Sequence, residues 1–253
     1  SQYFLSPSVL RIECGRARII TLQEPDFTIF DIQFKNAMDI QQRFSQDDLT
    51  RIKSAVKEAE SKISGEIVPV FVEKSSLYTI ANYRGALIGG ALVFLLIVIF
   101  DRYVPTLAVY DPVLIFALVV LGGLMGTALT HYISPVKRMM LSQSYMDQAT
   151  RKRAQAAFLE EEVFNTRQRT GIMIFISFFE HEVIVMADKG ISQVVEQKEW
   201  DAIVRMIIDH VKKGKVTDGI VAAINRCGQL LLEKGFVITH DDVNELKDDL
   251  RLE

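Results

Sequence analysis

The chain has 253 residues, of which 49% are hydrophobic, and its formal net charge is −3. This balance provides no general basic field, which argues against nucleic acid as a partner. The two cysteines, Cys14 and Cys227, are far apart and form no CxxC pair, so the sequence indicates neither a disulfide framework nor a zinc site.

Residues 1–43 form an N-terminal extension that we expect to contain strands. Phe30, Ile32 and Phe34 alternate with polar residues, which is the period-two pattern of a half-buried strand. The apolar side of such a strand needs a cover, so the extension is a candidate binding surface.

Residues 44–79 are interpreted as the first part of an α/β domain. Ser45 and Asp48 have the spacing of a capping box, and apolar residues then recur at helical spacing. A helix is predicted there, followed by an apolar strand at residues 66–72. Pro69 cannot donate to a sheet ladder, so we expect this strand to lie near a sheet edge or a bulge.

Residues 80–133 are predicted to form a transmembrane helical hairpin. Two apolar stretches, 80–100 and 112–133, are each long enough to cross a hydrocarbon core of about 30 Å at about 1.5 Å per helical residue. Their ionisable side chains are Arg84, near the start of the first stretch, and His131, at the end of the second. The alternative is a pair of buried helices in a soluble protein, but such helices normally keep a polar side.

Four tyrosines flank the two apolar stretches and are expected to act as membrane-interface anchors. Tyr83 and Tyr103 bracket the first stretch, and Tyr110 and Tyr132 bracket the second. Amphipathic aromatic rings settle at the level of the lipid headgroups. Their placement therefore supports the prediction of two membrane-spanning helices.

Basic residues near the two stretches predict how the hairpin is oriented. Lys74 and Arg84 lie at the first stretch and several Lys and Arg residues follow the second, whereas the connection between them offers only Arg102. Segments rich in Lys and Arg stay on the cytoplasmic side. Both termini are therefore expected on the cytoplasmic side of a bacterial inner membrane, or on the matrix side of a mitochondrial inner membrane.

Each apolar stretch also carries a GxxxG motif. Gly85 and Gly89 form the first motif, and Gly122 and Gly126 form the second. Small residues allow helix backbones to approach closely in lipid. The two helices could pack on each other through these glycines, or the glycines could dock on another membrane protein.

Residues 134–236 are interpreted as the second part of the α/β domain, and residues 237–253 as an acidic tail. Apolar periodicity predicts a helix from about Ser144 to Thr166, a strand hairpin that turns at Glu180 and His181, and two amphipathic helices. His181 is expected to be exposed in the turn of the strand hairpin. Because an even number of spans returns the chain to its starting side, the predicted fold class is α/β, a small mixed sheet flanked by helices and interrupted by the transmembrane hairpin.

Several segments resemble the membrane-inserted branch of the TPM domain family, which is named for thylakoid-lumen, photosystem-II-repair and worm receptor-associated founders. They include FSQDDLTRIKSAVKEAESKISGEIVPVFVEKSS, AAFLEEEVFNTRQRTGIMIFISFFEHEVIVMADKGI and EWDAIVRMIIDHVKKGKVTDGIVAAINRCGQLL. The resemblance implies a small α/β sandwich. It also implies a choice of roles, because some members are acid phosphatases, some bind calcium, and many assemble or repair large membrane complexes.

Three carboxylates are candidate metal ligands: Asp188, Asp218 and Glu66. Metal-assisted hydrolysis of a phosphate ester needs carboxylates that converge on one ion. Each of the three also has a simpler interpretation. Asp188 could serve a turn, and Asp218 could cap the start of a helix. Glu66 could form a salt bridge with Arg167 or Arg169. No catalytic residue and no organic cofactor is assigned. Calcium or magnesium would be the metal.

Two functions remain open from the sequence. The favoured one is a membrane-anchored accessory or assembly subunit of a larger membrane protein complex of the respiratory or photosynthetic type. Such a subunit acts by protein–protein contacts without catalysis, and its partners are the complex subunits and the lipid bilayer. The alternative is a membrane-bound, metal-dependent acid phosphatase.

Overall fold

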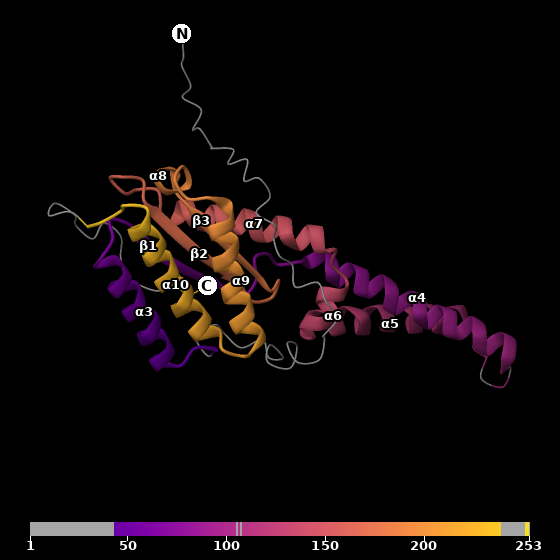
Figure 1. Ribbon diagram of the computed structural model, residues 1–253. Helices are drawn as coiled ribbons and strands as arrows, with labels where there is room; N and C mark the ends of the chain where they lie inside the picture. The colour runs from indigo at the N-terminus through magenta and orange to yellow at the C-terminus, as the bar shows by residue number, and fades with distance from the viewer. Residues whose placement is uncertain (1–42, 105, 107, 239–250, 253) are drawn as a thin grey trace, which may run out of the picture.

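The computed structural model describes residues 43–104, 106, 108–238 and 251–252. The strands expected in the N-terminal extension and most of the acidic tail lie outside the described residues. Figure 1 shows two parts, an α/β domain and a rod of two helices that projects from one end of it.

The domain is built on a four-stranded sheet with the strand order β3–β2–β1–β4. The strands are β1 (Glu66–Val72), β2 (Gly171–Ser177), β3 (Glu182–Ala187) and β4 (Arg251–Leu252). β1 and β2 pair in parallel along their whole length, β3 is antiparallel to β2, and β4 is parallel to β1. The segments before and after the hairpin therefore share one sheet, and the predicted fold class is confirmed for this domain.

Pro69 lies within β1, opposite Ile174 of β2. The Glu66 N–H donates to Thr170 O on the β2 side, and alternate residues of a strand direct their N–H groups to opposite sides. The nitrogen of Pro69 therefore faces away from β2, where its missing N–H breaks no bond of the long parallel ladder. On that far side the pairing with β4 covers only Val70 and Phe71.

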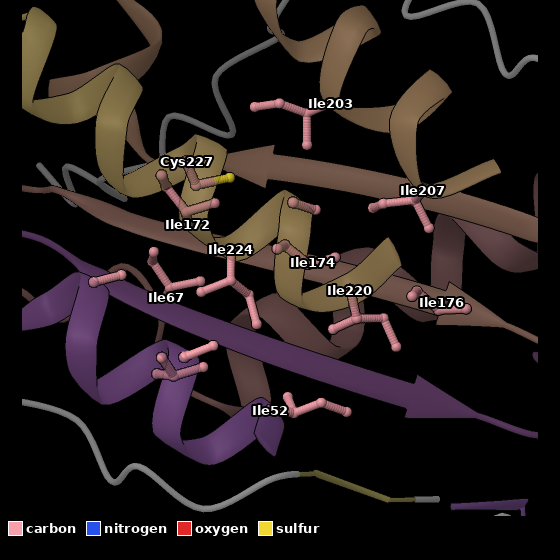
Figure 2. Packing of buried hydrophobic residues seen from close by; sticks show 14 of the residues in the cluster. Ile52, Ile67, Ile172, Ile174, Ile176, Ile203, Ile207, Ile220, Ile224 and Cys227 are labelled. Atoms are coloured by element: carbon pink, nitrogen blue, oxygen red, sulfur yellow. The ribbon is translucent and has the colours of Figure 1, made fainter. Parts of the chain in front are cut away.

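Helices cover both faces of the sheet. One face carries α3 (Gln46–Glu60), α9 (Gln197–Lys212) and α10 (Val216–Glu233), and the other carries α7 (Gln143–Glu160). Successive strand residues point to opposite faces, so Ile67 joins the first core and Val68 the second. Figure 2 shows how isoleucines of α3, α9 and α10 meet Ile172, Ile174 and Ile176 of β2.

The capping box predicted at the start of α3 is present. Ser45 Oγ accepts from the Asp48 N–H at 3.1 Å, and Asp48 Oδ2 accepts from the Ser45 N–H at 3.0 Å. These two bonds satisfy donors that the first turn of a helix leaves without intrahelical partners. They explain why the helix begins where the sequence indicated.

α7 ends at Glu160, earlier than the sequence pattern predicted. Glu162 has a left-handed backbone with φ of 51°, and Val163 is fully buried against the start of β2. A Cβ on Gly171 would lie 2.0 Å from Val163 O, so the close approach of these two backbones requires glycine. The need to bury Val163 therefore overrides the local helical pattern.

The rod consists of α4 (Thr79–Tyr103) and α5 (Pro112–Tyr132), which match the two predicted apolar stretches to within a few residues. Both are long and apolar enough to cross a membrane, and only 11% of the most apolar window of each is buried. Leu87 is 74% exposed and Phe116 is 70% exposed. Within the described part of the chain, these two helices are not buried in a core.

Two features stabilise the start of α5. Asp111 Oδ1 accepts from the Val113 and Leu114 N–H groups at 2.8 and 3.0 Å, and Pro112 occupies the first helical position. The short helix α6 (Ser134–Met139) follows α5 and leads to α7. A second short helix, α8 (Lys189–Ser192), follows β3.

Candidate functional site

The most concentrated group of buried polar side chains lies where the rod joins the domain. The chain leaves the carboxyl end of β1 to enter α4, and it leaves the carboxyl end of β2 to turn into β3. Open α/β sheets bind ligands outside the carboxyl ends of their parallel strands, which makes this place the first to examine. The polar junction comprises Ser75, Tyr78, Arg138, Ser177, Glu180, His181 and Glu182.

Glu180 is the centre of the polar junction and is only 1% exposed. Its Oε1 accepts from the Ser75 N–H at 2.8 Å and from the Tyr78 hydroxyl, and its Oε2 accepts from the Ser177 hydroxyl. Three donors from two chain segments thus satisfy a carboxylate that would be costly to bury alone. Glu180 ties the start of α4 to the end of β2.

Tyr78 is the N-cap residue of α4 and has a left-handed backbone with φ of 50°. Its ring stacks on Phe179 with centroids 5.3 Å apart, and its hydroxyl is held by Glu180. Burial, reinforced by the negative charge of Glu180, raises the pKa of Tyr78 far above its ordinary value. The phenol therefore keeps its proton and acts as a fixed hydrogen-bond donor.

His181 is half-buried, so the expectation of an exposed histidine was wrong. Arg138 of α6 reaches its imidazole ring and also donates to Glu180 O at 3.5 Å. Burial is the larger cause that lowers the pKa of His181 to about 2, and the charges of Arg138 and Arg43 add to it. The imidazole is therefore neutral near pH 7, when it can accept a hydrogen bond from Arg138.

Glu182 is the first residue of β3 and is 2% exposed. Neither of its carboxylate oxygens meets a donor at full hydrogen-bonding geometry, although the Thr150 hydroxyl lies near enough to favour the charged form. Burial raises the pKa of Glu182 to about 7, and Asp147 and Glu180 act in the same direction. This carboxyl gains or loses a proton close to neutral pH.

The side chains of the polar junction bond to one another and join the start of the rod to the domain. The Ser177 hydroxyl is the obvious nucleophile, but Ser177 is almost completely buried and its proton is donated to Glu180. A nucleophile must reach the reacting atom of its substrate, and here the side chains close on one another. The same groups are well suited to fix the angle between the domain and α4.

The three predicted metal ligands lie apart from the polar junction. Asp188 caps α8 through a bond from the Lys189 N–H at 2.7 Å, and its Oδ2 lies 2.8 Å from Arg169 Nε. Asp218 lies in the first turn of α10. Its Oδ1 is 2.7 Å from Arg51 Nη2.

Glu66 is the half-buried first residue of β1. Within the part of the chain that the structure describes, no three His, Cys, Asp or Glu side chains gather so that they could hold a metal ion. Asp188, Asp218 and Glu66 are therefore not brought together around one point. Their predicted role as calcium or magnesium ligands gains no geometric support.

Cys227 is fully buried in the core beneath α10. Burial raises the pKa of its thiol to about 12, so the reactive thiolate is scarce at neutral pH. Cys227 is a packing residue of this core. Cys14 lies outside the described residues.

The four glycines of the GxxxG motifs lie at the contact between α4 and α5. A Cβ on Gly126 would lie 2.1 Å from Gly85 O, and a Cβ on Gly89 would lie 2.3 Å from Gly122 O. Both distances are far shorter than real Cβ atoms show, so the backbones touch where the side chains are missing. The glycines serve the packing of the two helices on each other.

The four tyrosines expected at the membrane interface are all exposed. Tyr83 and Tyr103 belong to α4, Tyr132 ends α5, and Tyr110 lies in the connection between the helices. Each ring projects from the rod without cover from the described part of the chain. Their role as anchors stays a prediction.

Residues 138–230 match the family model of the TPM domain. The match covers this segment of the chain, which is similar to the TPM domain family. The matched segment runs from the end of α6 through α7, β2, β3 and α9 into α10, so it contains the second half of the sheet and the helices on both of its faces. We call the α/β part of the chain the TPM domain from here on.

One solved structure supports the fold of the TPM domain. The NMR structure of the BA42 protein from the psychrophilic bacterium Bizionia argentinensis is 19% identical to this chain, with a TM-score of 0.50. The alignment covers 82% of this chain and 94% of the BA42 chain. At this identity the likeness concerns the fold alone. No curated protein matches the chain.

The polar junction was not identified from the sequence. Glu180 and His181 were assigned only to a turn, and Tyr78 and Ser177 were given no role. Glu180 lies more than 100 residues beyond Tyr78, so only the folded sheet brings them together. One feature of the sequence could have indicated the polar junction. Glu180 follows the apolar run of β2 by three residues, and a charged side chain so close to a buried strand needs a partner.

Proposed function

We propose that the chain is a membrane-anchored accessory or assembly subunit of a larger membrane protein complex of the respiratory or photosynthetic type. The rod of α4 and α5 is the anchor, and the TPM domain acts by protein–protein contacts without catalysis. The membrane is a bacterial inner membrane or the mitochondrial inner membrane, with both chain termini on the cytoplasmic or matrix side.

The exposure of the rod supports an anchor. Its large apolar side chains point outward on α4 and α5, and together they form an apolar surface far larger than soluble monomers leave uncovered. All backbone groups within the two helices can be satisfied inside the helices, as a hydrocarbon environment demands. Lipid is the environment that suits both properties.

The charges at the base of the rod support the proposed orientation. α4 and α5 run side by side as a hairpin, so both join the TPM domain at the same end (Figure 1). Lys74, Lys137 and Arg138 belong to this end, whereas Arg102 lies at the far tip. The excess of positive charge at the base is typical of the cytoplasmic side.

The closure of the polar junction is the observation that carries the proposal of a non-catalytic role. The carboxyl edge of the sheet is where a TPM-sized α/β domain would offer a reactive site, and Glu180, Tyr78 and Ser177 occupy it with bonds to one another. These bonds join the domain to its anchor. A rigid link of this kind serves to present the TPM domain at a fixed height and angle to a neighbouring protein.

Two measurements on native membranes test the proposal. The full chain should resist extraction at alkaline pH, and in mild detergent it should migrate on a native gel together with other membrane proteins that mass spectrometry identifies in fixed ratio. Release by alkaline carbonate would contradict the anchor. Migration only as a monomer or homo-oligomer would contradict the role as a subunit.

A metal-dependent acid phosphatase is the second candidate, and Asp188 is the residue on which it is tested. Asp188 is a buried carboxylate at the point where β3 ends and α8 begins, a place that suits a metal ligand as well as a cap. The assay is hydrolysis of phosphomonoesters by the purified chain, with and without calcium or magnesium. Metal-dependent activity that Asp188→Asn abolishes and the control Asp209→Asn retains would favour this candidate over the first.

A further inference from the structure

We propose that Lys74 and Lys137 form a binding site for the phosphate of an anionic phospholipid headgroup at the base of the rod. The site lies on the side of the TPM domain that faces the membrane, and it includes the exposed apolar residues Leu77 and Met139. We call these four residues the lipid shoulder. The inference rests on the proposed anchoring of α4 and α5 in a bilayer.

The position of the two lysines follows from the hairpin. Lys74 lies a few residues before α4 begins at Thr79, and Lys137 lies a few residues after α5 ends at Tyr132. Because α4 and α5 join the TPM domain at the same end, both lysines lie at the level of one leaflet. That level is the headgroup region, where Lys and Arg interact with lipid phosphates.

Lys74 and Lys137 precede two segments that pack on each other, because Tyr78 and Ala81 share a buried cluster with Leu141 and Met146. Burial lowers the pKa of Lys137, and the charge of Lys74 lowers it further. Within the described residues neither ammonium group forms a salt bridge. A phosphate between two lysines would replace this repulsion with two charge-assisted hydrogen bonds.

The neighbouring arginines are engaged elsewhere and hold the site in place. Arg84 of α4 donates through Nη1 to Met140 O at 2.5 Å, and Arg138 donates to Glu180 O and contacts His181. These bonds attach α6 to the base of α4 on one side and to the polar junction on the other. The segment that carries Lys137 is therefore held by both arginines.

Two apolar side chains complete the lipid shoulder. Leu77 is 71% exposed in the segment after Lys74, and Met139 is 70% exposed at the end of α6. A basic residue beside an exposed apolar residue is typical of segments that lie in the membrane interface. The lysine stems can lie along the acyl boundary while their ammonium groups reach the phosphates.

The experiment uses the purified full chain in mild detergent, titrated with phosphatidylglycerol or phosphatidylcholine and followed by native mass spectrometry. The wild-type chain should retain phosphatidylglycerol in preference to phosphatidylcholine. Each lysine near the lipid surface contributes about a fivefold gain in affinity for an anionic headgroup. The double variant Lys74→Gln, Lys137→Gln should therefore bind phosphatidylglycerol about 5-fold to 25-fold more weakly, with phosphatidylcholine unchanged.

A matched pair of lysines serves as the control. Lys189 in α8 and Lys234 after α10 are exposed and lie at the amino end of β1 and β2, opposite the rod. The double variant Lys189→Gln, Lys234→Gln should retain the wild-type preference, and Lys74→Arg, Lys137→Arg should retain most of it. Both results would support a site at the lipid shoulder rather than a general effect of net charge.

Three outcomes would overturn the proposal. The first is an unchanged affinity for phosphatidylglycerol in Lys74→Gln, Lys137→Gln. The second is an equal loss in the control pair. The third is full displacement of the lipid by inorganic phosphate at equal concentration, which would indicate a site for free phosphate. A chain that resists carbonate extraction but shows no headgroup preference refutes this site alone, whereas a chain released by carbonate refutes the membrane anchor itself.

Discussion

The TPM domain and the rod use the same kinds of apolar side chain in opposite ways. In the domain, Ile174 and Phe175 point into cores that helices close on both faces of the sheet. In the rod, Leu87 and Phe116 point outward, and glycines occupy the contact between the helices. If the rod is anchored in a membrane as we propose, the surroundings of each part, water or lipid, decide which side chains turn inward.

The two contacts also depend on different forces. Burying apolar area in water contributes about 25 cal/mol per Å² and drives the packing of the TPM domain. In the proposed lipid surroundings of α4 and α5 that force is absent, and close packing of backbone on backbone has to stabilise the pair. The stability of the rod therefore depends more on the fit between the two helix backbones, and the stability of the domain depends more on the apolar area that it buries.

The largest expected effect comes from truncating a phenylalanine in each region. Phe175→Ala removes a fully buried ring from the TPM domain and should lower its free energy of unfolding by about 3–5 kcal/mol. Phe116→Ala removes an exposed ring from α5 and should leave the unfolding of the TPM domain unchanged. Thermal unfolding of both variants in mild detergent, followed by near-ultraviolet circular dichroism, measures the difference. Equal losses would mean that the rod is part of one packed core with the domain.

A smaller effect, which depends on pH, is expected for Glu182→Gln. The pKa of Glu182 is raised from 4.5 to about 7 in the folded chain, so the folded state holds its proton more tightly than the unfolded state. The contribution of Glu182 to stability therefore falls as pH rises from about 4.5 to about 7, by about 3 kcal/mol in total. Glu182→Gln should match the wild type at pH 4 and exceed its stability at pH 8.

Chemical denaturation at several pH values measures this effect. The difference between Glu182→Gln and the wild type isolates Glu182 from His181, whose lowered pKa destabilises the folded state as pH falls below about 6.5. A difference that does not vary with pH would show that water or a cation reaches the Glu182 carboxylate. The charged Glu182 carboxylate would then destabilise the domain no more than an exposed carboxylate does.

A pair of alanine substitutions tests the glycine contact in the rod. Gly126→Ala places a methyl group 2.1 Å from Gly85 O and should cost about 1–3 kcal/mol by forcing α4 and α5 apart. Gly90→Ala meets Val119 O at 3.4 Å, which is ordinary contact, and should be tolerated. Unfolding of the rod with increasing SDS in mixed micelles, measured by the loss of helical signal, compares the two. If both variants behave alike, the twin motifs do not determine the packing.

The smallest effect is expected at the surface of the TPM domain. Asp218→Asn removes the exposed ion pair with Arg51 and should cost about 0.2–1 kcal/mol at low salt, and less at 1 M salt. Chemical denaturation at the two salt concentrations measures this. If calcium stabilises the wild type but not Asp218→Asn, Asp218 would be a metal ligand rather than the partner of Arg51.

Periodic features of the sequence predicted most of the fold. The capping box at Ser45, the apolar run of β2 and the two long apolar stretches each reflect short-range physics, and the helices and strands formed where these patterns lie. Where a long-range contact intervened, prediction was less accurate. α7 stops at Glu160 because Val163 is needed against Gly171, a demand that no local pattern contains.

The polar junction could not have been predicted in detail for the same reason. Whether Glu180 is a solvated turn residue or a buried acceptor depends on Tyr78, which lies on the other side of the hairpin in sequence. The half-burial of His181 depends likewise on Arg138 of α6. Asp188 was recognised as capable of either serving a turn or binding a metal, and the structure adds its ion pair with Arg169, which no local pattern contains.

The parallel pairing of β1 with β2 has a consequence for how the chain is made. The ribosome releases β1 first and β2 roughly 100 residues later, a delay of about 5–20 s at ordinary rates of synthesis. If α4 and α5 cross a bilayer, the two strands meet only when both helices have been inserted, because a single crossing leaves them in different compartments. The sheet then works as a checkpoint on insertion, since a chain in which only one of the two helices has crossed the bilayer cannot close it.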